Sequence, residues 1–480
     1  MFPEDRTLEL DAAAMRDLVD RAMARIVPHL ETLGEQSAAQ WEGGEELARS
    51  LVEPMPEDGA PLDDLLELLF ERLAPHSFNC AGPGYLAFIP GGGLFHSAVA
   101  DLIADSINRY VGAWLAAPGL VQLETNVIRW FCDMVGYPPG AGGFLSSGGS
   151  VANFTAVVTA RRERLDDDFL RGSLYVCDQV HHSVAKAAVL AGFPPANVRE
   201  IASDDEYRLR LPELERRIRA DAADGWQPFL VVASAGTTNS GAVDDLAGVA
   251  ALARREGLWL HVDAAYGGFF ALTERGRRIL RGLSEADSIT LDPHKGLFLP
   301  FGTGSLVVRD LETLRRAHST RAAYMPPMQD EADLVDFCEI SPELSRDFRG
   351  LRVWLPLKLH GAGPFRRNLD EKLDLARWAT AELEKVPDVE IVARPQLSLV
   401  AFALSPPGCE GEERDRLNRE FLRRVNERRR VYLTGTVLHG RFALRFCILS
   451  FRTHRDRVAM ALEDVREAAA EVLAGVPAAR

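Results

Sequence analysis

The chain has 480 residues, 47% hydrophobic and 26% charged, which is the balance of an ordinary globular protein with more than one domain. Its formal net charge of −15 argues against a nucleic-acid surface, because phosphate backbones are bound by clustered lysine and arginine. No apolar run approaches the ~20 residues that span a bilayer, and no basic and apolar leader is visible, so we expect a cytoplasmic protein without a membrane partner.

Two helices are predicted in the first 80 residues. Residues 8–27 carry apolar side chains on roughly one face, and residues 62–73 form a second amphipathic pattern after a Pro-, Gly- and acid-rich linker. The segment 1–80 is too thin to bury a core of its own. We therefore expect it to pack on something else, such as a partner subunit.

Residues 81–365 alternate short, β-rich apolar runs with helical patterns. The runs predicted as strands are residues 173–177, 229–233, 258–262, 288–291 and 305–308. Predicted helices include residues 151–164, 211–222 and 246–256. Buried strands separated by helices imply βαβ crossovers, and hence an α/β domain with a mostly parallel sheet covered by helices on both faces.

Residues 366–480 have a different pattern, with helices and strands in blocks. Helices are predicted at residues 367–385 and 455–473, and strands at residues 389–392, 397–404 and 443–450. This arrangement indicates a smaller C-terminal α+β domain. The six cysteines include no CxxC pair, which is typical of free thiols in a reducing compartment.

Polar residues follow several of the predicted strands, where ligands collect in open α/β sheets. The strand in LWLHVDAAY ends at Asp263, which could pair with a protonated ring nitrogen or simply cap the next turn. The small Ala265 would let a flat ring lie against the backbone. Thr237 and Thr238 close another strand end, and Asp244 follows in a position to hold a loop.

Lys295 ends the stretch SITLDPHK and is followed by glycine and apolar residues, so it is more than a surface loop lysine. A lysine in a dry, cationic site has a lowered pKa and is nucleophilic towards carbonyls. The chain has four other lysines, which lie in helical patterns with polar neighbours and are expected to be solvated: Lys186, Lys358, Lys372 and Lys385.

A phosphate cradle is predicted at residues 143–153, GFLSSGGSVAN, where a Gly/Ser-rich turn opens a helix. Backbone N–H groups at a helix N-terminus bind anions, and no GK[ST] follows to make a Walker loop. In DQVHHS, His181 or His182 could stack on an aromatic ring. A metal site is not expected there, because adjacent histidines diverge and no HxxxH or HExxH accompanies them.

A lysine, a ring-nitrogen aspartate, a stacking histidine and a phosphate cradle at the strand ends of one sheet are the parts that a pyridoxal cofactor needs. On the motifs LHVDAAY and DPHK, with the Gly/Ser turn and DQVHHS, the chain resembles the group II pyridoxal-phosphate decarboxylases. The resemblance looks closest to the aromatic-L-amino-acid branch. It spans nearly the whole chain, from PGYLAF near residues 83–88 to FALRFC at residues 442–447.

This resemblance implies the aspartate-aminotransferase-like fold type I, a homodimer whose N-terminal segment packs across the interface, and pyridoxal 5'-phosphate as cofactor. Lys295 would carry the cofactor, Asp263 would pair with its ring nitrogen, and His181 would stack on it. Ala265 would lie against the other face, and Thr238 near the ring. Residues implied for the phosphate are Gly149, Ser150 and His294.

The implied reaction is decarboxylation of an aromatic or hydrophobic L-amino acid to the amine and CO₂. His181 and the loop residue Tyr324 would position the substrate and protonate its Cα. Asp292 stands where aromatic enzymes often carry asparagine. The segments 89–93 and 110–114, which align with the substrate pocket, are richer in glycine than in the aromatic enzymes, so they do not identify the substrate. Arg349 and Arg445 match family positions without an assigned role. The alternatives are an aldehyde synthase that couples decarboxylation to oxidative deamination, an aminotransferase, a C–C lyase and a non-catalytic paralogue.

Overall fold

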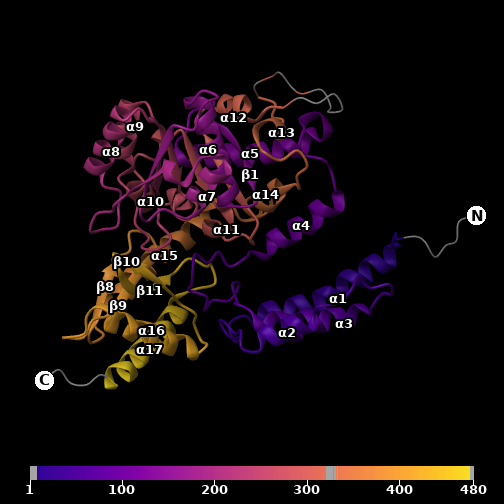
Figure 1. The fold of residues 1–480 in the computed structure, drawn as a ribbon. Coiled ribbons are helices and arrows are strands. Elements are labelled where there is room, and N and C mark those ends of the chain that lie inside the picture. The colour runs from indigo at the N-terminus through magenta and orange to yellow at the C-terminus, as the bar shows by residue number, and fades with distance from the viewer. Residues whose placement is uncertain (1–7, 321–327, 329–330, 332, 476–480) are drawn as a thin grey trace, which may run out of the picture.

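The computed structural model describes residues 8–320, 328, 331 and 333–475, and is built around a seven-stranded sheet of order β1-β7-β6-β5-β4-β2-β3 (Figure 1). The neighbouring pairs from β3 to β6 are parallel, whereas β7 runs antiparallel to both β6 and β1. The expectation of a mostly parallel sheet is confirmed. The strands are β1 (Gly142–Ser146), β2 (Gly172–Cys177), β3 (Val198–Ile201), β4 (Gln227–Ser234), β5 (Trp259–Asp263), β6 (Ser288–Leu291) and β7 (Gly304–Val308).

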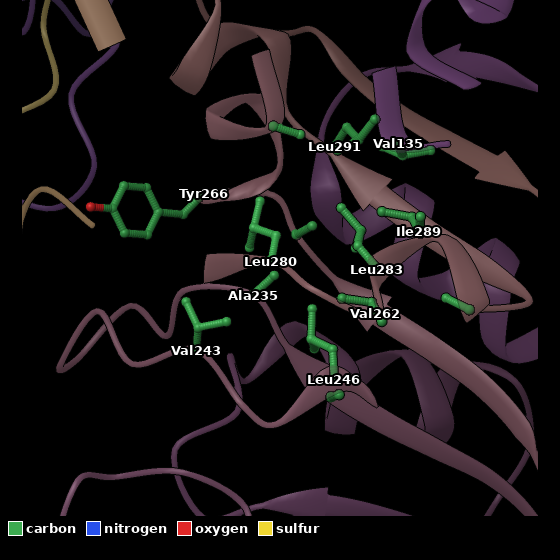
Figure 2. Close-up of a cluster of buried hydrophobic side chains, with 14 of the residues drawn as sticks. Val135, Ala235, Val243, Leu246, Val262, Tyr266, Leu280, Leu283, Ile289 and Leu291 are labelled. Atoms are coloured by element: carbon green, nitrogen blue, oxygen red, sulfur yellow. The ribbon is translucent and has the colours of Figure 1, made fainter. Parts of the chain in front are cut away.

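Helices cover both faces of this sheet, as the alternation along β4 shows. Val231 packs with α9 in one apolar cluster, whereas its neighbour Val232 packs with α6 in another. Figure 2 shows part of the first cluster, where Val262 lies near Leu246 of α9 and Ile289 lies near Leu283. The helices of this domain are α4 (Phe95–Ile107), α5 (Pro118–Val135), α6 (Gly149–Arg164), α7 (Ser183–Leu190), α8 (Leu211–Ala223), α9 (Leu246–Glu256), α10 (Glu274–Ile279), α11 (Pro293–Gly296), α12 (Leu311–His318), α13 (Phe337–Ile340) and α14 (Arg349–His360).

The C-terminal part holds a separate antiparallel sheet of order β10-β11-β9-β8, with three helices packed on it (Figure 1). Phe402, Phe421 and Phe446 lie at the centre of its apolar cluster. The elements are α15 (Ala362–Leu383), β8 (Val389–Ala393), β9 (Leu399–Leu404), α16 (Gly411–Glu427), β10 (Thr434–Leu438), β11 (Arg441–Cys447) and α17 (Arg455–Ala474). The predicted small α+β domain is therefore present, with α16 and β10 added.

The N-terminal helices form an arm beside the rest of the molecule (Figure 1). The arm comprises α1 (Ala12–Glu31), α2 (Gly44–Ser50) and α3 (Leu62–Glu67), which continues as a π-helical turn over residues 68–73. No residue of α1 is buried. The end of the arm meets the small domain, where the Phe78 and Tyr432 rings lie 4.8 Å apart.

One expectation about the lysines is wrong. Lys186, Lys358 and Lys385 are exposed, but Lys372 is fully buried. Its Nζ donates to the carbonyl of Thr453 at 2.6 Å and to Glu371 at 2.8 Å, and burial lowers the pKa of its ammonium. The helical pattern around Lys372 could not reveal an acceptor that comes from a distant loop.

Candidate active site

A cavity of about 270 Å³ lies at the carboxyl ends of the parallel strands. Its lining brings together these predicted site residues: Gly149, Ser150, His181, Thr238, Asp263, Ala265, His294 and Lys295. They come from β5, α11 and α6 and from the turns after β2 and β4. Tyr324 lies outside the described residues, so its predicted role stays a prediction.

The start of α6 faces this cavity through Ser147, Gly148 and Gly149. Gly148 is the N-cap residue and has no side chain to accept from the N–H groups of the first turn. These groups and the positive end of the helix dipole suit an anion. The turn is tightly packed against the start of β7, because a Cβ on Gly304 would lie 2.5 Å from the backbone of Gly148.

Lys295 lies on the short helix α11 between β6 and β7, and its side chain is 21% exposed. Its Nζ is 2.9 Å from Oδ2 of Asp292. Burial acts to lower the pKa of Lys295, but the charges of Asp292 and Asp263 outweigh it and raise that pKa. The expected lowering is therefore wrong, because the lysine is flanked by carboxylates instead of cations.

Asp263 is the last residue of β5 and is 8% exposed. Its Oδ1 accepts from the backbone N–H of Ala265 at 3.1 Å, and its Oδ2 accepts from Nδ2 of Asn153 at 3.0 Å. These two donors fix the orientation of the carboxyl group. The arrangement places an oriented hydrogen-bond acceptor at one end of the cavity.

Two histidines of the lining are held in defined orientations. His181 Nδ1 is 2.7 Å from Ser183 Oγ, and His294 Nδ1 donates to the carbonyl of Thr303 at 2.6 Å. Burial lowers the pKa of both imidazoles, although the charge of Asp263 opposes the shift at His181 and that of Asp292 at His294. Both rings are therefore neutral at neutral pH and can lie against an aromatic ring.

Asn153, Ser183 and His261 also belong to the site, although the sequence patterns did not predict them. Asn153 sits in the first turns of α6, and its amide joins Asp263 to Ser183. The signal for His261 was its place two residues before Asp263, which puts both side chains on one face of the strand. For Asn153, the signal was a polar residue on a helix face that packs on a sheet.

The two unassigned arginines have structural contacts. Arg445, 3% exposed, donates to the carbonyls of Asn239 and Phe88 and to Thr434 Oγ1, so it ties the small domain to two loops. Arg349 pairs with two carboxylates that follow α13, Glu343 and Asp347. Asp244 accepts from the N–H groups of Ser234 and Leu209 and so holds loops, as expected.

These residues fit pyridoxal phosphate. The first turn of α6 can take the phosphate, Asp263 can take a protonated ring nitrogen, and Lys295 Nζ lies in the same cavity. Asp292 Oδ1 is buried and has no hydrogen-bond partner among the described residues, so the cavity wall contains a polar atom that is still free to accept a hydrogen bond. Within the described ranges, no group of three or more His, Cys, Asp or Glu residues could hold a metal ion, and no helix is long and apolar enough to cross a membrane.

Comparisons with known proteins agree with this fit. The family model for the pyridoxal-dependent decarboxylase conserved domain matches residues 45–405. The aromatic-L-amino-acid decarboxylase of Bacillus atrophaeus is 34% identical over 472 residues, covering 98% of each chain. The phenylacetaldehyde synthase of Arabidopsis thaliana is 29% identical over 444 residues, covering 89% of this chain and 90% of the other. The crystal structure of Oryza sativa TDC with PLP and tryptamine superposes with a TM-score of 0.92 at 28% identity, covering 97% and 99%.

Proposed function

Because the chain belongs to the pyridoxal-dependent decarboxylase family, and is a pyridoxal-phosphate-dependent amino-acid decarboxylase, we propose that its substrate is an aromatic L-amino acid. The observation that carries the proposal is the cavity that joins Lys295, Asp263 and the start of α6. The name of the Bacillus relative, an aromatic-L-amino-acid decarboxylase, supports the substrate class.

The roles of the residues are part of the proposal. Lys295 would hold the cofactor covalently, and Asp263 would hold a proton on its ring nitrogen. The N–H groups at the start of α6, with Ser150 and His294, would bind its phosphate. When bound, pyridoxal phosphate supplies a conjugated ring that accepts the electron pair left when CO₂ departs.

The remaining residues would orient the cofactor and the substrate and protonate the substrate carbon. His181, neutral and held by Ser183, would stack on the ring and lie beside the substrate carboxylate. Ala265 would leave room on the opposite side, and Thr238 would lie near the ring. Tyr324 would give a proton to Cα and exclude water and oxygen.

The walls of the site support an aromatic side chain. The segment 88–91 packs directly on the lysine turn, because a Cβ on Gly91 would lie 1.9 Å from the carbonyl oxygen of His294. The same segment carries two apolar residues close to Gly91 in sequence, Phe88 and Ile89. Among the described residues that line the cavity, Lys295 is the only lysine or arginine, so an acidic side chain would find no fixed cation.

A panel of L-amino acids, with CO₂ release and product mass recorded together, tests this function. We expect tryptophan, tyrosine or phenylalanine to give the matching amine. A competition in which glutamate or aspartate is preferred would contradict the substrate class. Aldehyde with hydrogen peroxide as the main product would instead support the second candidate, an aldehyde synthase, which the Arabidopsis relative suggests.

The proposal includes a cytoplasmic homodimer of three-part chains, with units at residues 1–80, 81–365 and 366–480. The uncovered face of α1 supports the dimer, because Met15, Leu18 and Val19 are exposed there. The six cysteines are unpaired, which suits a reducing compartment. Sedimentation of the full chain tests the dimer, and a monomer at micromolar concentration would contradict it.

A further inference from the structure

A continuous line of hydrogen bonds runs beneath the cavity from Trp259 to Asp263. Trp259 Nε1 lies 2.8 Å from Ser288 Oγ, which lies 2.8 Å from His261 Nδ1. His261 Nε2 is 3.0 Å from Asn153 Oδ1, and Asn153 Nδ2 is 3.0 Å from Asp263 Oδ2. The first four of these residues are at most 3% exposed, so bulk water does not compete for the contacts.

Strand register and helix packing create this line. β5 and β6 pair so that His261 lies opposite Ser288, and Asp263 lies opposite Thr290. α6 packs across both strands and places Asn153 against them. Thr290 Oγ1 gives a second hydrogen bond to Asn153 Oδ1 at 2.7 Å, which fixes the amide from the other side.

The chemistry of each group sets the direction of its proton. A carboxylate only accepts, so Asn153 turns its NH₂ towards Asp263 and its oxygen towards His261. His261 Nε2 must then carry a proton. An indole only donates, so Ser288 accepts from Trp259 and gives its own proton to His261 Nδ1. All four donors point towards Asp263.

A neutral His261 completes this pattern. Burial lowers its pKa, and the charge of Asp263 opposes the shift only in part. A neutral imidazole has one N–H and one acceptor nitrogen, which is what its two neighbours require. The proton positions are thus determined along the whole line.

We propose that Asn153 and His261 are positioning residues, which orient Asp263 and strengthen the hydrogen bond to its Oδ2 through a one-way relay that starts at Trp259. Hydrogen bonds in such a chain polarise one another, and buried donors stabilise a carboxylate. The inference rests on the proposed role of Asp263 as partner of the cofactor's ring nitrogen.

Asn153 also connects the two sides of the cofactor site. The same Nδ2 donates to Ser183 Oγ at 2.9 Å, and Ser183 lies 2.7 Å from His181 Nδ1. One amide therefore sets the orientation of Asp263 and of His181 together. The relay residues Trp259, Ser288 and His261 do not line the cavity, so their hydrogen bonds reach Asp263 through Asn153.

Other titratable groups also face Asp263. They are Lys295 and His181 across the cavity and His261 on the same strand, with Asp292 beyond Lys295. Lys295, His181 and Asp292 stay unchanged in the variants of the relay described next. A difference between those variants therefore reports the relay.

The test measures the dissociation constant of pyridoxal phosphate as a function of pH, using the full-length chain stripped of cofactor and titrated by absorbance. A carboxylate that loses a donor protonates more readily, so the acid limb of binding should move to higher pH. For Asn153→Leu we expect a shift of about one pH unit or more, and for His261→Phe about half a unit. Trp259→Phe should give a smaller shift, because it is farthest from Asp263.

Rescue and controls separate a relay from a packing effect. His261→Gln keeps a donor for Asn153, so its acid limb should return towards that of the parent. Thr155→Val is the matched control, because Thr155 is fully buried on the same helix and its hydroxyl donates within α6, to the Val151 carbonyl. Melting temperatures of the cofactor-free proteins report any loss of fold. If Asn153→Leu does not fold, the comparison of His261→Phe with His261→Gln still tests the relay.

Two results would overturn the relay: a folded His261→Phe with the acid limb of the parent, or an equal shift in Thr155→Val. Asp263→Ala distinguishes this failure from failure of the proposed function. If Asp263→Ala binds the cofactor with the pH dependence of the parent, the role of Asp263 itself is wrong. If Asp263→Ala abolishes the acid limb but the relay variants do not change it, only the relay is wrong.

Discussion

Replacing Asp263 by alanine tests the chemical centre of the site. The side chain is 8% exposed and accepts two hydrogen bonds, from Ala265 and Asn153, so it is held where a ring nitrogen would meet it. Without the carboxylate, that nitrogen has no partner to keep its proton, and the ring accepts electrons poorly. Cofactor should still bind in part, because Lys295 and the start of α6 remain.

The expected loss can be scaled from burial. Removing one partner of a buried charge pair costs about 3–5 kcal/mol, and each 1.36 kcal/mol in the barrier is about tenfold in rate. Turnover should therefore fall by about 10²–10⁴-fold. Release of CO₂ from an aromatic amino acid, at saturating cofactor and substrate, measures the loss. Turnover within a few-fold of the parent would refute the reasoning.

Three further predictions concern the lysine, the loop tyrosine and the histidines. Lys295→Ala should give a colourless protein without borohydride-reducible cofactor. As much reducible cofactor as in the parent protein would contradict the role of Lys295 as the residue that carries it. Tyr324→Phe should slow amine formation and divert part of the flux to aldehyde and peroxide; equal amine yield without aldehyde would remove Tyr324 from the mechanism. The free energy of unfolding should fall as pH decreases from about 6.5 to about 4, because histidines kept neutral by burial take up protons when the chain unfolds. Denaturant melts at several pH values measure this slope. His318 should contribute strongly, because burial lowers its pKa to about 4. A flat dependence of stability on pH that His318→Phe leaves unchanged would contradict this prediction.

Sequence patterns predicted most of the parallel sheet, because its central strands are short apolar runs buried on both faces. β1 was not identified, since its sequence GGFLS is rich in glycine, and neither was β3, an edge strand whose side chains are mostly only half buried. The antiparallel direction of β7 was also unexpected. Strand direction depends on pairing between distant segments, which local periodicity does not record.

The candidate site was predictable where a polar residue follows a strand, as for Asp263 and Lys295. The residues behind it were not. Asn153 and Thr290 are 137 positions apart, and Lys372 meets a carbonyl 81 positions away. Such contacts exist only after α6 and the small domain have packed, so no window of sequence contains both partners.

The placement of Lys295 between two antiparallel strands has a consequence for how the protein folds. β6 and β7 are joined by residues 292–303 alone, so their pairing is local and its loop closure is cheap. The contact of β1 with β7 and that of α6 with β6 join segments far apart in the chain, and non-local contacts form more slowly. During refolding, the turn that bears Lys295 should therefore form before α6 closes over it. Pyridoxal phosphate should leave the early refolding phase unchanged and act only on the late one, by slowing the reopening of the finished site.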